Sequence, residues 1–212
     1  MRLPERSILF DTGGDSHTLL DNMLKLQIDP QEVEAVVLSH AHGDHTGGLG
    51  GFLEQNSNVT VYLPGSFPQG FKDDVAYLGA KVEEIYEARE LMPGVYSTGE
   101  LGAGIEEQSL IITTSQGLVI ITGCAHPGVV NIIQRAKEVV PDSNVYLVLG
   151  GFHLIGASSA ELESIIDSFR QLGVESVAPC HCSGDQTRQL FKERYGKNYI
   201  ESGVGKIIPL PF

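Results

Sequence analysis

The sequence has no tryptophan and only three cysteines in 212 residues. A small, odd number of cysteines argues against a disulfide framework and fits a reducing compartment, so we expect a cytoplasmic protein. Basic residues are also scarce, because 14 lysines and arginines face 27 aspartates and glutamates, a formal charge of −13. Such a chain repels polyanions, and we therefore expect no nucleic-acid partner.

Long apolar runs are missing as well. No run approaches the roughly 18–20 residues of a membrane span, and the first six residues have no apolar core, so neither a membrane segment nor a signal peptide is expected. No phosphate-binding loop or dinucleotide fingerprint occurs among the glycine-rich segments. With 42% hydrophobic and 19% charged residues, the composition is that of a globular protein. We expect a single domain over residues 1–212 that acts on a small molecule.

Short apolar runs rich in β-branched residues alternate with segments of helical periodicity. The predicted strands are residues 7–10, 33–38, 59–63, 81–85, 110–114, 118–122, 145–149, 174–179 and 206–208. Helices are predicted around residues 19–26, 129–136, 162–169 and 185–195. This alternation is typical of an α/β layered fold, and the hairpin predicted over residues 110–122 makes its sheet mixed.

The most informative segment is residues 36–48, in which an apolar strand ends and a polar loop begins. His40, His42, Asp44 and His45 lie within six residues of each other. Imidazole and carboxylate are ligands that Zn²⁺ and similar metals prefer. Because side-chain direction repeats every two residues in extended chain, His40 and His42 could hold one ion, while Asp44 and His45 could face a second.

Other histidines follow predicted strands in the same way, namely His126, His153 and His181. Ligands of α/β sheets bind at the carboxyl ends of strands, so these side chains are expected to converge although they are far apart in sequence. We predict His126 and His181 as metal ligands. His153 is predicted either as a ligand or as a proton donor to the substrate, and His17 as a surface residue at a helix start.

The cysteines and one aspartate leave alternatives open. Cys124 ends a strand two residues before His126, and it is either a metal ligand or a core residue. Cys180 and Cys182 flank His181, so a period of two turns them away from it, and both are expected to be small buried residues. Asp11 ends the first strand, where it either orients the histidine loop or serves as a turn residue.

Several of these segments resemble motifs of the metallo-β-lactamase superfamily in their order and spacing. They are FDTG at residues 10–13, HAHGDH at 40–45, TGC at 122–124 and PCHCSG at 179–184. Three longer segments are similar to the dihydropterin synthase-like branch of that superfamily: TGCAHPG at 122–128, GGFHL at 150–154 and APCHC at 178–182.

The resemblance implies a four-layer αββα sandwich with two mixed sheets and a dinuclear metal site at one edge. The residues that match the superfamily's ligand positions are His40, His42, Asp44, His45 and His181. Three departures stand out. The segment before residue 110 has no histidine, and His126 could substitute for it; Cys124 stands where an aspartate often bridges the metals. The hairpin that usually precedes the Asp11 motif is apparently absent, so that a sheet edge could be incomplete or covered by a partner.

The leading hypothesis is a hydrolase that uses a metal-bound hydroxide at a dinuclear site on a small ester or phosphoester. The expected cofactors are two divalent ions, with zinc favoured and iron or manganese as alternatives. Asp44 would bind metal and orient the water, and His153 could protonate the leaving group. The rival hypotheses are a transferase that uses a pterin diphosphate and a non-catalytic metal-binding or sensor protein. Self-association into a homo-oligomer stays open.

Overall fold

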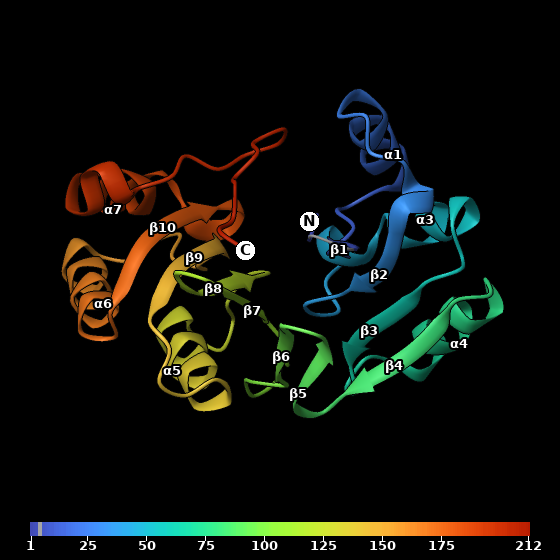
Figure 1. The fold of residues 1–212 in the computed structure, drawn as a ribbon, viewed down its shortest axis with the longest axis horizontal. Coiled ribbons are helices and arrows are strands. Elements are labelled where there is room, and N and C mark those ends of the chain that lie inside the picture. The colour runs from blue at the N-terminus through green and yellow to red at the C-terminus, as the bar shows by residue number, and fades with distance from the viewer. Residues whose placement is uncertain (4–5) are drawn as a thin grey trace. The chain divides into compact units, whose positions relative to one another are not determined.

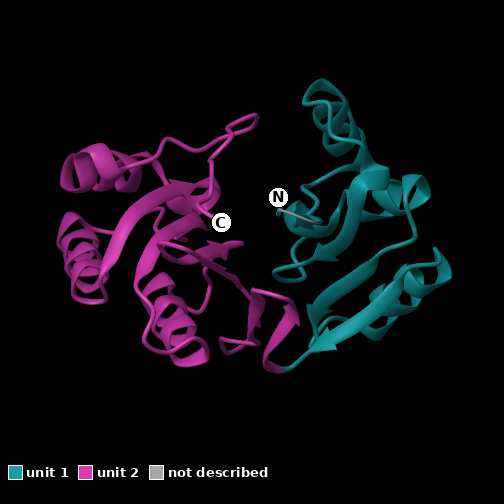
Figure 2. Ribbon diagram, viewed as in Figure 1, with its two compact units in different colours: residues 1–86 teal, residues 87–212 magenta. Residues whose placement is uncertain are grey.

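The computed structural model describes residues 1–3 and 6–212; Pro4 and Glu5, in the segment where no signal peptide is expected, lie outside the described residues. The chain divides into two compact units, unit 1 (Met1–Tyr86) and unit 2 (Glu87–Phe212), which Figure 2 colours separately. Each is described by itself. The single domain over residues 1–212 stays a prediction.

Unit 1 alternates strands and helices along the chain (Figure 1). Its elements are β1 (Ser7–Phe10), α1 (Ser16–Lys25), the 3₁₀ turn η1 (Pro30–Glu32), β2 (Val33–Val37), α2 (Gly43–Thr46), α3 (Leu49–Gln55), β3 (Thr60–Pro64), α4 (Gln69–Tyr77) and β4 (Lys81–Ile85).

The sheet of unit 1 has the strand order β1-β2-β3-β4, and within the described residues each neighbouring pair is parallel. Parallel neighbours require crossover connections, which α1, α3 and α4 supply. Val36, Val37 and Val61 are fully buried, as expected for a parallel sheet covered on both faces. The expectation of two mixed sheets is therefore wrong for this one, because its strands are joined by helices and not by hairpins.

Unit 2 begins with antiparallel strands and continues with parallel strands and helices. Its elements are β5 (Glu87–Met92), β6 (Val95–Gly99), β7 (Leu110–Thr114), β8 (Gly117–Thr122), α5 (Val129–Val139), β9 (Val145–Gly151), α6 (Ser159–Gln171), β10 (Val174–Cys180), the 3₁₀ turn η2 (His181–Ser183), α7 (Asp185–Tyr195) and the 3₁₀ turn η3 (Gly196–Asn198).

The sheet of unit 2 is mixed, as predicted, in the order β10-β9-β8-β7-β6-β5. The pairs from β5 to β8 are antiparallel, and the predicted hairpin is formed by β7 and β8. The strands β8, β9 and β10 are parallel neighbours. Their carboxyl ends consequently lie at one edge of the sheet, where the segments that follow them are neighbours in space.

Helix α5 shows why the periodic segments of unit 2 become helices. Val129, Ile132, Ile133 and Ala136 recur at helical spacing, and all four are buried. Behind the sheet edge, Phe152 packs against Phe169 and Phe191 with ring centroids 5.7 and 5.6 Å away. This aromatic group belongs to the hydrophobic core of unit 2, and it anchors the segment that immediately precedes His153.

Some predicted elements differ from the structure. Residues 206–208 form no strand, because their β-branched side chains have no strand partner among the described residues, and Ile207 is 82% exposed. The edge strand β5 and its neighbour β6 were not predicted, and neither was α4, whose sequence is mostly polar. Helix α3 contains Gly50 and Gly51, although glycine is unfavourable inside a helix. Among the described residues, no helix is both long and apolar enough to cross a membrane.

Substitution of Gly150 in β9 tests how closely the backbones of β8 and β9 pack at the edge of the sheet. Its φ is +125°, and a Cβ built there would lie 2.1 Å from the carbonyl oxygen of Thr122. We expect Gly150→Ala to lower the free energy of unfolding by about 3 kcal/mol, measured by urea unfolding. The control is Gly70→Ala in α4, where a Cβ meets open space; it should raise the free energy of unfolding by about 0.5–1 kcal/mol. Equal midpoints for the two variants would contradict this account.

Candidate metal centre

In unit 1 the predicted histidine cluster follows two neighbouring strands. Asp11 comes directly after β1, His40 and His42 follow β2, and Asp44 and His45 lie in the short helix α2. Because β1 and β2 are parallel neighbours, their carboxyl ends bring Asp11 and the histidine loop together.

Asp11 holds the loop that carries the histidines. Its Oδ1 accepts a hydrogen bond from the Ser39 backbone N–H at 2.7 Å, and its Oδ2 accepts from the Ser39 hydroxyl at 2.8 Å. The same Oδ2 lies 2.7 Å from Nδ1 of His45. The expectation that Asp11 orients the histidine loop agrees with these contacts, which involve a side chain that is only 13% exposed.

These hydrogen bonds also assign the protons on two imidazole rings. A carboxylate only accepts, so His45 donates from Nδ1 to Asp11. The Ser39 hydroxyl donates to Asp11 and therefore accepts from Nδ1 of His40, at 2.8 Å. In both rings Nε2 is then the nitrogen whose lone pair can bind a metal, which is the arrangement that a hydrogen-bonded partner imposes on metal-binding histidines.

The imidazole nitrogens have the spacing of ligands to a common ion. Nε2 of His40 and Nδ1 of His42 are 3.0 Å apart, and two nitrogens bound to one Zn²⁺ at about 2.0–2.1 Å are separated by about 2.9–3.4 Å. Oδ2 of Asp44 lies 3.5 Å from Nε2 of His45. His40 and His45 are buried, whereas His42 and Asp44 are exposed. In unit 1 the His40–His42 pair therefore has the spacing of two ligands to one divalent metal, and the Asp44–His45 pair offers two further donors close together.

In unit 2 a buried carboxylate organises the segment after β8. Glu107 is 1% exposed, and its Oε1 accepts the backbone N–H groups of Gly123, Cys124 and Ala125 at 3.1, 3.0 and 2.9 Å. Its Oε2 accepts the N–H of His126 at 2.9 Å. A single side chain therefore accepts hydrogen bonds from four successive backbone amides and fixes the positions of Cys124 and His126.

The sulfur atoms of two cysteines come together with His153 in unit 2. The Sγ atoms of Cys124 and Cys182 and a ring nitrogen of His153 all lie within 4.8 Å of one another. The expectation that Cys180 and Cys182 are buried residues is wrong, because both are only partly buried, and the Cys182 sulfur lies beside Cys124 and His153. Residues 181–183 form a 3₁₀ turn in which His181 has φ of +48°, so the two-residue period of extended chain does not apply there.

The thiols differ in their chemistry. Hydrogen bonding to Cys124 lowers the pKa of the Cys182 thiol to about 5; contacts with His153 and the field of His181 act in the same direction, against partial burial. Burial raises the pKa of the Cys180 thiol. Cys180 belongs to none of the ligand groups identified among the described residues. Within that part of the chain no disulfide joins the cysteines, as their small number suggests.

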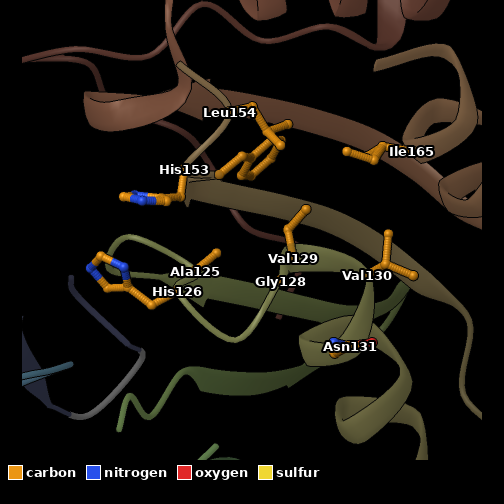
Figure 3. Close-up of a pocket in the computed structure, with 10 residues that line it drawn as sticks. Ala125, His126, Gly128, Val129, Val130, Asn131, His153, Leu154 and Ile165 are labelled. Carbon is orange, nitrogen blue, oxygen red and sulfur yellow. The ribbon is translucent and has the colours of Figure 1, made fainter. Parts of the chain in front are cut away.

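His126 and His153 face each other at the mouth of a small pocket in unit 2 (Figure 3). Their ring centroids are 4.3 Å apart. The pocket has a volume of about 190 Å³, and apolar side chains such as Val129, Phe152 and Leu154 form much of its lining. Two imidazoles beside an apolar pocket suit a substrate that presents a polar reacting group and a small apolar part.

Backbone strain gathers at the same strand ends. Asp11, Ala125, His153 and His181 all have φ between +48° and +63°, a region that side-chain-bearing residues rarely adopt. Each such conformation costs on the order of 1–3 kcal/mol and persists only where the surroundings impose it. Two of these four residues, His153 and His181, are predicted site residues. Ala125 lies between two further predicted site residues, Cys124 and His126.

Several residues of the centre were not found from sequence. Ser39, Glu107 and Cys182 all contribute contacts that position or complete the ligand groups. Glu107 lies in the segment before residue 110, where the resemblance leads us to expect a histidine, but the missing histidine did not reveal the role of Glu107. His17, predicted as a surface residue, is exposed in α1.

The family model of the metallo-beta-lactamase superfamily matches residues 1–140. The chain therefore belongs to the metallo-β-lactamase superfamily, and the predicted α/β fold of this superfamily is confirmed, although the described sheet of unit 1 is parallel and not mixed. A relative from Methanocaldococcus jannaschii, named 7,8-dihydropterin-6-methyl-4-(beta-D-ribofuranosyl)-aminobenzene-5'-phosphate synthase, is 29% identical over 96% of this chain and 84% of its own. The resemblance to the dihydropterin synthase-like branch is thereby confirmed.

Solved structures agree on the fold. The crystal structure of Tm1679, described as a metal-dependent hydrolase of the beta-lactamase superfamily, has a TM-score of 0.78 and 30% identity, covering 94% of this chain and 87% of the other. The short form of human tRNase Z has a TM-score of 0.59 at 17% identity, covering 85% of this chain and 83% of the other, a likeness that concerns the fold alone.

Asp11→Asn tests the histidine loop. An amide offers one accepting oxygen where the carboxylate offers two, so one of its contacts with Ser39 or His45 is lost. We expect the affinity for Zn²⁺ to fall by about 10- to 100-fold, measured by competition with a chromophoric chelator. The control is Asp29→Asn, at an exposed carboxylate that accepts only from Gln31 N–H among the contacts resolved for it. Unchanged affinity in Asp11→Asn would refute the positioning role.

Glu107→Gln tests the carboxylate beneath Cys124 and His126. The amide nitrogen cannot accept, so at least one buried backbone N–H loses its acceptor, and we expect unfolding to become easier by about 2–3 kcal/mol. The neighbouring Glu106→Gln changes a carboxylate that contacts Gly104 N–H at the surface and should stay within about 0.5 kcal/mol. Urea unfolding followed by circular dichroism measures both, and similar midpoints would disprove the role of Glu107.

Proposed function

We propose that the protein is a metal-dependent hydrolase that acts on a small ester or phosphoester. The observation that carries the proposal is the imidazole pair of unit 1. Nε2 of His40 lies 3.0 Å from Nδ1 of His42, and the other nitrogen of His40 is hydrogen-bonded to Ser39, which in turn donates to Asp11. Superfamily membership and the similarity to a protein described as a metal-dependent hydrolase support it.

We assign two divalent ions to this protein as cofactors, with zinc favoured and iron or manganese as alternatives. The proposed ligands in unit 1 are His40, His42, Asp44 and His45, and those in unit 2 are Cys124, His126 and His181. Five of these residues, His40, His42, Asp44, His45 and His181, are assigned because they match the superfamily's ligand positions. Cys124 and His126 are assigned because they follow the end of β8.

When bound, such ions supply polarisation of a carbonyl or phosphoryl oxygen and a lower pKa for water. The protein's own groups would do the rest. The Asp44 side chain, 56% exposed, would orient the attacking water. His153, exposed at the mouth of the pocket, would protonate the leaving group if it is not itself a ligand.

A second candidate function is transfer to an aromatic acceptor. It is favoured by the similarity to the methanogen synthase, whose name specifies a dihydropterin joined through a methyl carbon to an aminobenzene. In this reaction the acceptor would attack the methylene carbon of a pterin diphosphate, the carbon–oxygen bond would break, diphosphate would leave and the acceptor would lose a proton. A non-catalytic metal-binding or sensor protein is the third alternative.

A combined assay separates these functions. Zinc-loaded protein is offered phosphodiester, phosphomonoester, thioester and lactone substrates, and separately a dihydropterin diphosphate with an aminobenzoate-type acceptor. For hydrolysis, we expect turnover that a chelator abolishes and zinc restores. His42→Ala should lower kcat/KM by at least about 100-fold, since it removes a proposed ligand.

His17→Ala serves as the matched control, because His17 is an exposed histidine on α1. Its kcat/KM should equal that of the unchanged protein. Joined pterin–acceptor product would favour the transferase, whereas free pterin alcohol alone would favour hydrolysis. Turnover that is equal in His42→Ala and insensitive to chelator would refute a metal-dependent reaction, and absence of any turnover with metal bound would support the sensor.

A further inference from the structure

We propose that Cys124, His153 and Cys182 form a thiolate-containing site for one soft or borderline divalent cation, which unit 2 builds from its own residues. Their three ligand atoms lie within 4.8 Å of one another. This inference deepens the proposed function. It rests on that function in one respect, because both proposals assign Cys124 as a metal ligand. It adds Cys182 as a ligand and gives His153 the role of ligand.

The spacing suits one ion after small side-chain rotations. At a tetrahedral Zn²⁺ with bonds of about 2.3 Å to sulfur and 2.0–2.1 Å to nitrogen, the ligand atoms are about 3.5–3.8 Å apart. The observed upper limit of 4.8 Å exceeds this by about 1 Å. Rotations about χ1 can close such a gap, and three protein ligands leave a fourth position open, as in catalytic zinc sites.

A glycine keeps room for the sulfur. A Cβ built on Gly151 would lie 2.3 Å from the Gly123 carbonyl oxygen, 2.7 Å from Sγ of Cys182 and 3.1 Å from Cα of Cys124. Cβ atoms do not approach other atoms within 3.0 Å, so any other residue here would displace the Gly123 backbone and the Cys182 sulfur. Glycine at the carboxyl end of β9 therefore allows the residue 123–124 backbone and the Cys182 sulfur to lie close together.

The three segments that carry the ligands are fastened to one another. The Phe152 N–H donates to Oγ of Ser183 at 3.1 Å, and that hydroxyl donates to the Cys180 carbonyl at 2.6 Å. The Gly151 N–H donates to the Gly123 carbonyl at 3.1 Å, while Sγ of Cys182 lies 3.5 Å from the Cys124 carbonyl oxygen. Ligands held in this way lose little freedom on binding a metal.

The donor chemistry differs from that of unit 1. Two sulfur ligands favour softer cations, whereas the imidazole and carboxylate set of unit 1 also accepts Mn²⁺ or Fe²⁺. Two thiolates and a neutral imidazole would balance the charge of one divalent ion, which lessens the cost of holding that ion beside the buried Cys124.

Cobalt absorption in the full chain tests the site without requiring a substrate. Metal-free protein in a phosphine reductant is titrated with Co²⁺, and thiolate ligation is detected as a charge-transfer band in the near ultraviolet. We expect this band in the unchanged protein and a decrease of about half in Cys182→Ser and in Cys124→Ser, because each loses one of two thiolates. His153→Ala should weaken cobalt binding by at least about 10-fold.

Two variants serve as controls. Cys180→Ser removes the neighbouring thiol that belongs to none of the identified ligand groups, and its band should be unchanged. His42→Ala removes a ligand proposed for unit 1 and should keep the thiolate band. A full-strength band in Cys182→Ser would overturn the inference. Visible cobalt bands without a charge-transfer band would also overturn it, while the metal binding required by the proposed function would stand.

Alkylation of the unchanged protein covers the case in which a serine variant fails to fold. Iodoacetamide labelling is followed cysteine by cysteine by peptide mass spectrometry, with and without Cd²⁺. We expect Cd²⁺ to slow labelling of Cys182 by at least about 10-fold relative to Cys180, since coordinated sulfur is a poor nucleophile. Equal labelling of Cys182 with and without Cd²⁺ would overturn the inference, whatever the variants do.

Discussion

The rest of the structure depends on the hydrogen bonds that the buried Glu107 and the largely buried Asp11 accept from the segments after the strands. A chain that leaves a sheet exposes backbone N–H groups that need acceptors when they are buried. Glu107 accepts four of them from residues 123–126, and Asp11 accepts from Ser39 and His45. These contacts convert flexible loops into rigid supports, and they allow strained residues such as Ala125 to persist at the candidate ligand positions.

The candidate metal donors of the two units differ in chemical character. Unit 1 presents imidazole and carboxylate beside the hydrogen-bonded Asp11 and Ser39, and unit 2 presents two sulfurs and an imidazole whose ligand atoms lie within 4.8 Å of one another. Hard and borderline ions suit the donors of unit 1, and softer ions suit those of unit 2.

Hydrolysis and transfer make similar demands on the chain. Both need a cation beside the leaving group and differ in the nucleophile, which is water in one case and an aromatic ring or amine in the other. The similarity to a metal-dependent hydrolase and to a pterin-joining synthase is compatible with this shared chemistry. Exclusion of water around the apolar pocket next to His126 and His153 is the property that would decide between the two.

The sequence by itself determined the features that have a local period or a local motif. The α/β class, the buried face of α5 and the histidine cluster at 40–45 follow from spacing alone. Tertiary structure decided the features that depend on residues distant in the sequence. Glu107 accepts hydrogen bonds from backbone amides 16–19 residues further along the chain, and Cys182 contacts Cys124, from which it is separated by 58 positions. The failed strand at 206–208 shows the same limit. A strand needs a partner and a buried carboxylate needs donors, and neither is encoded within a few residues of the chain.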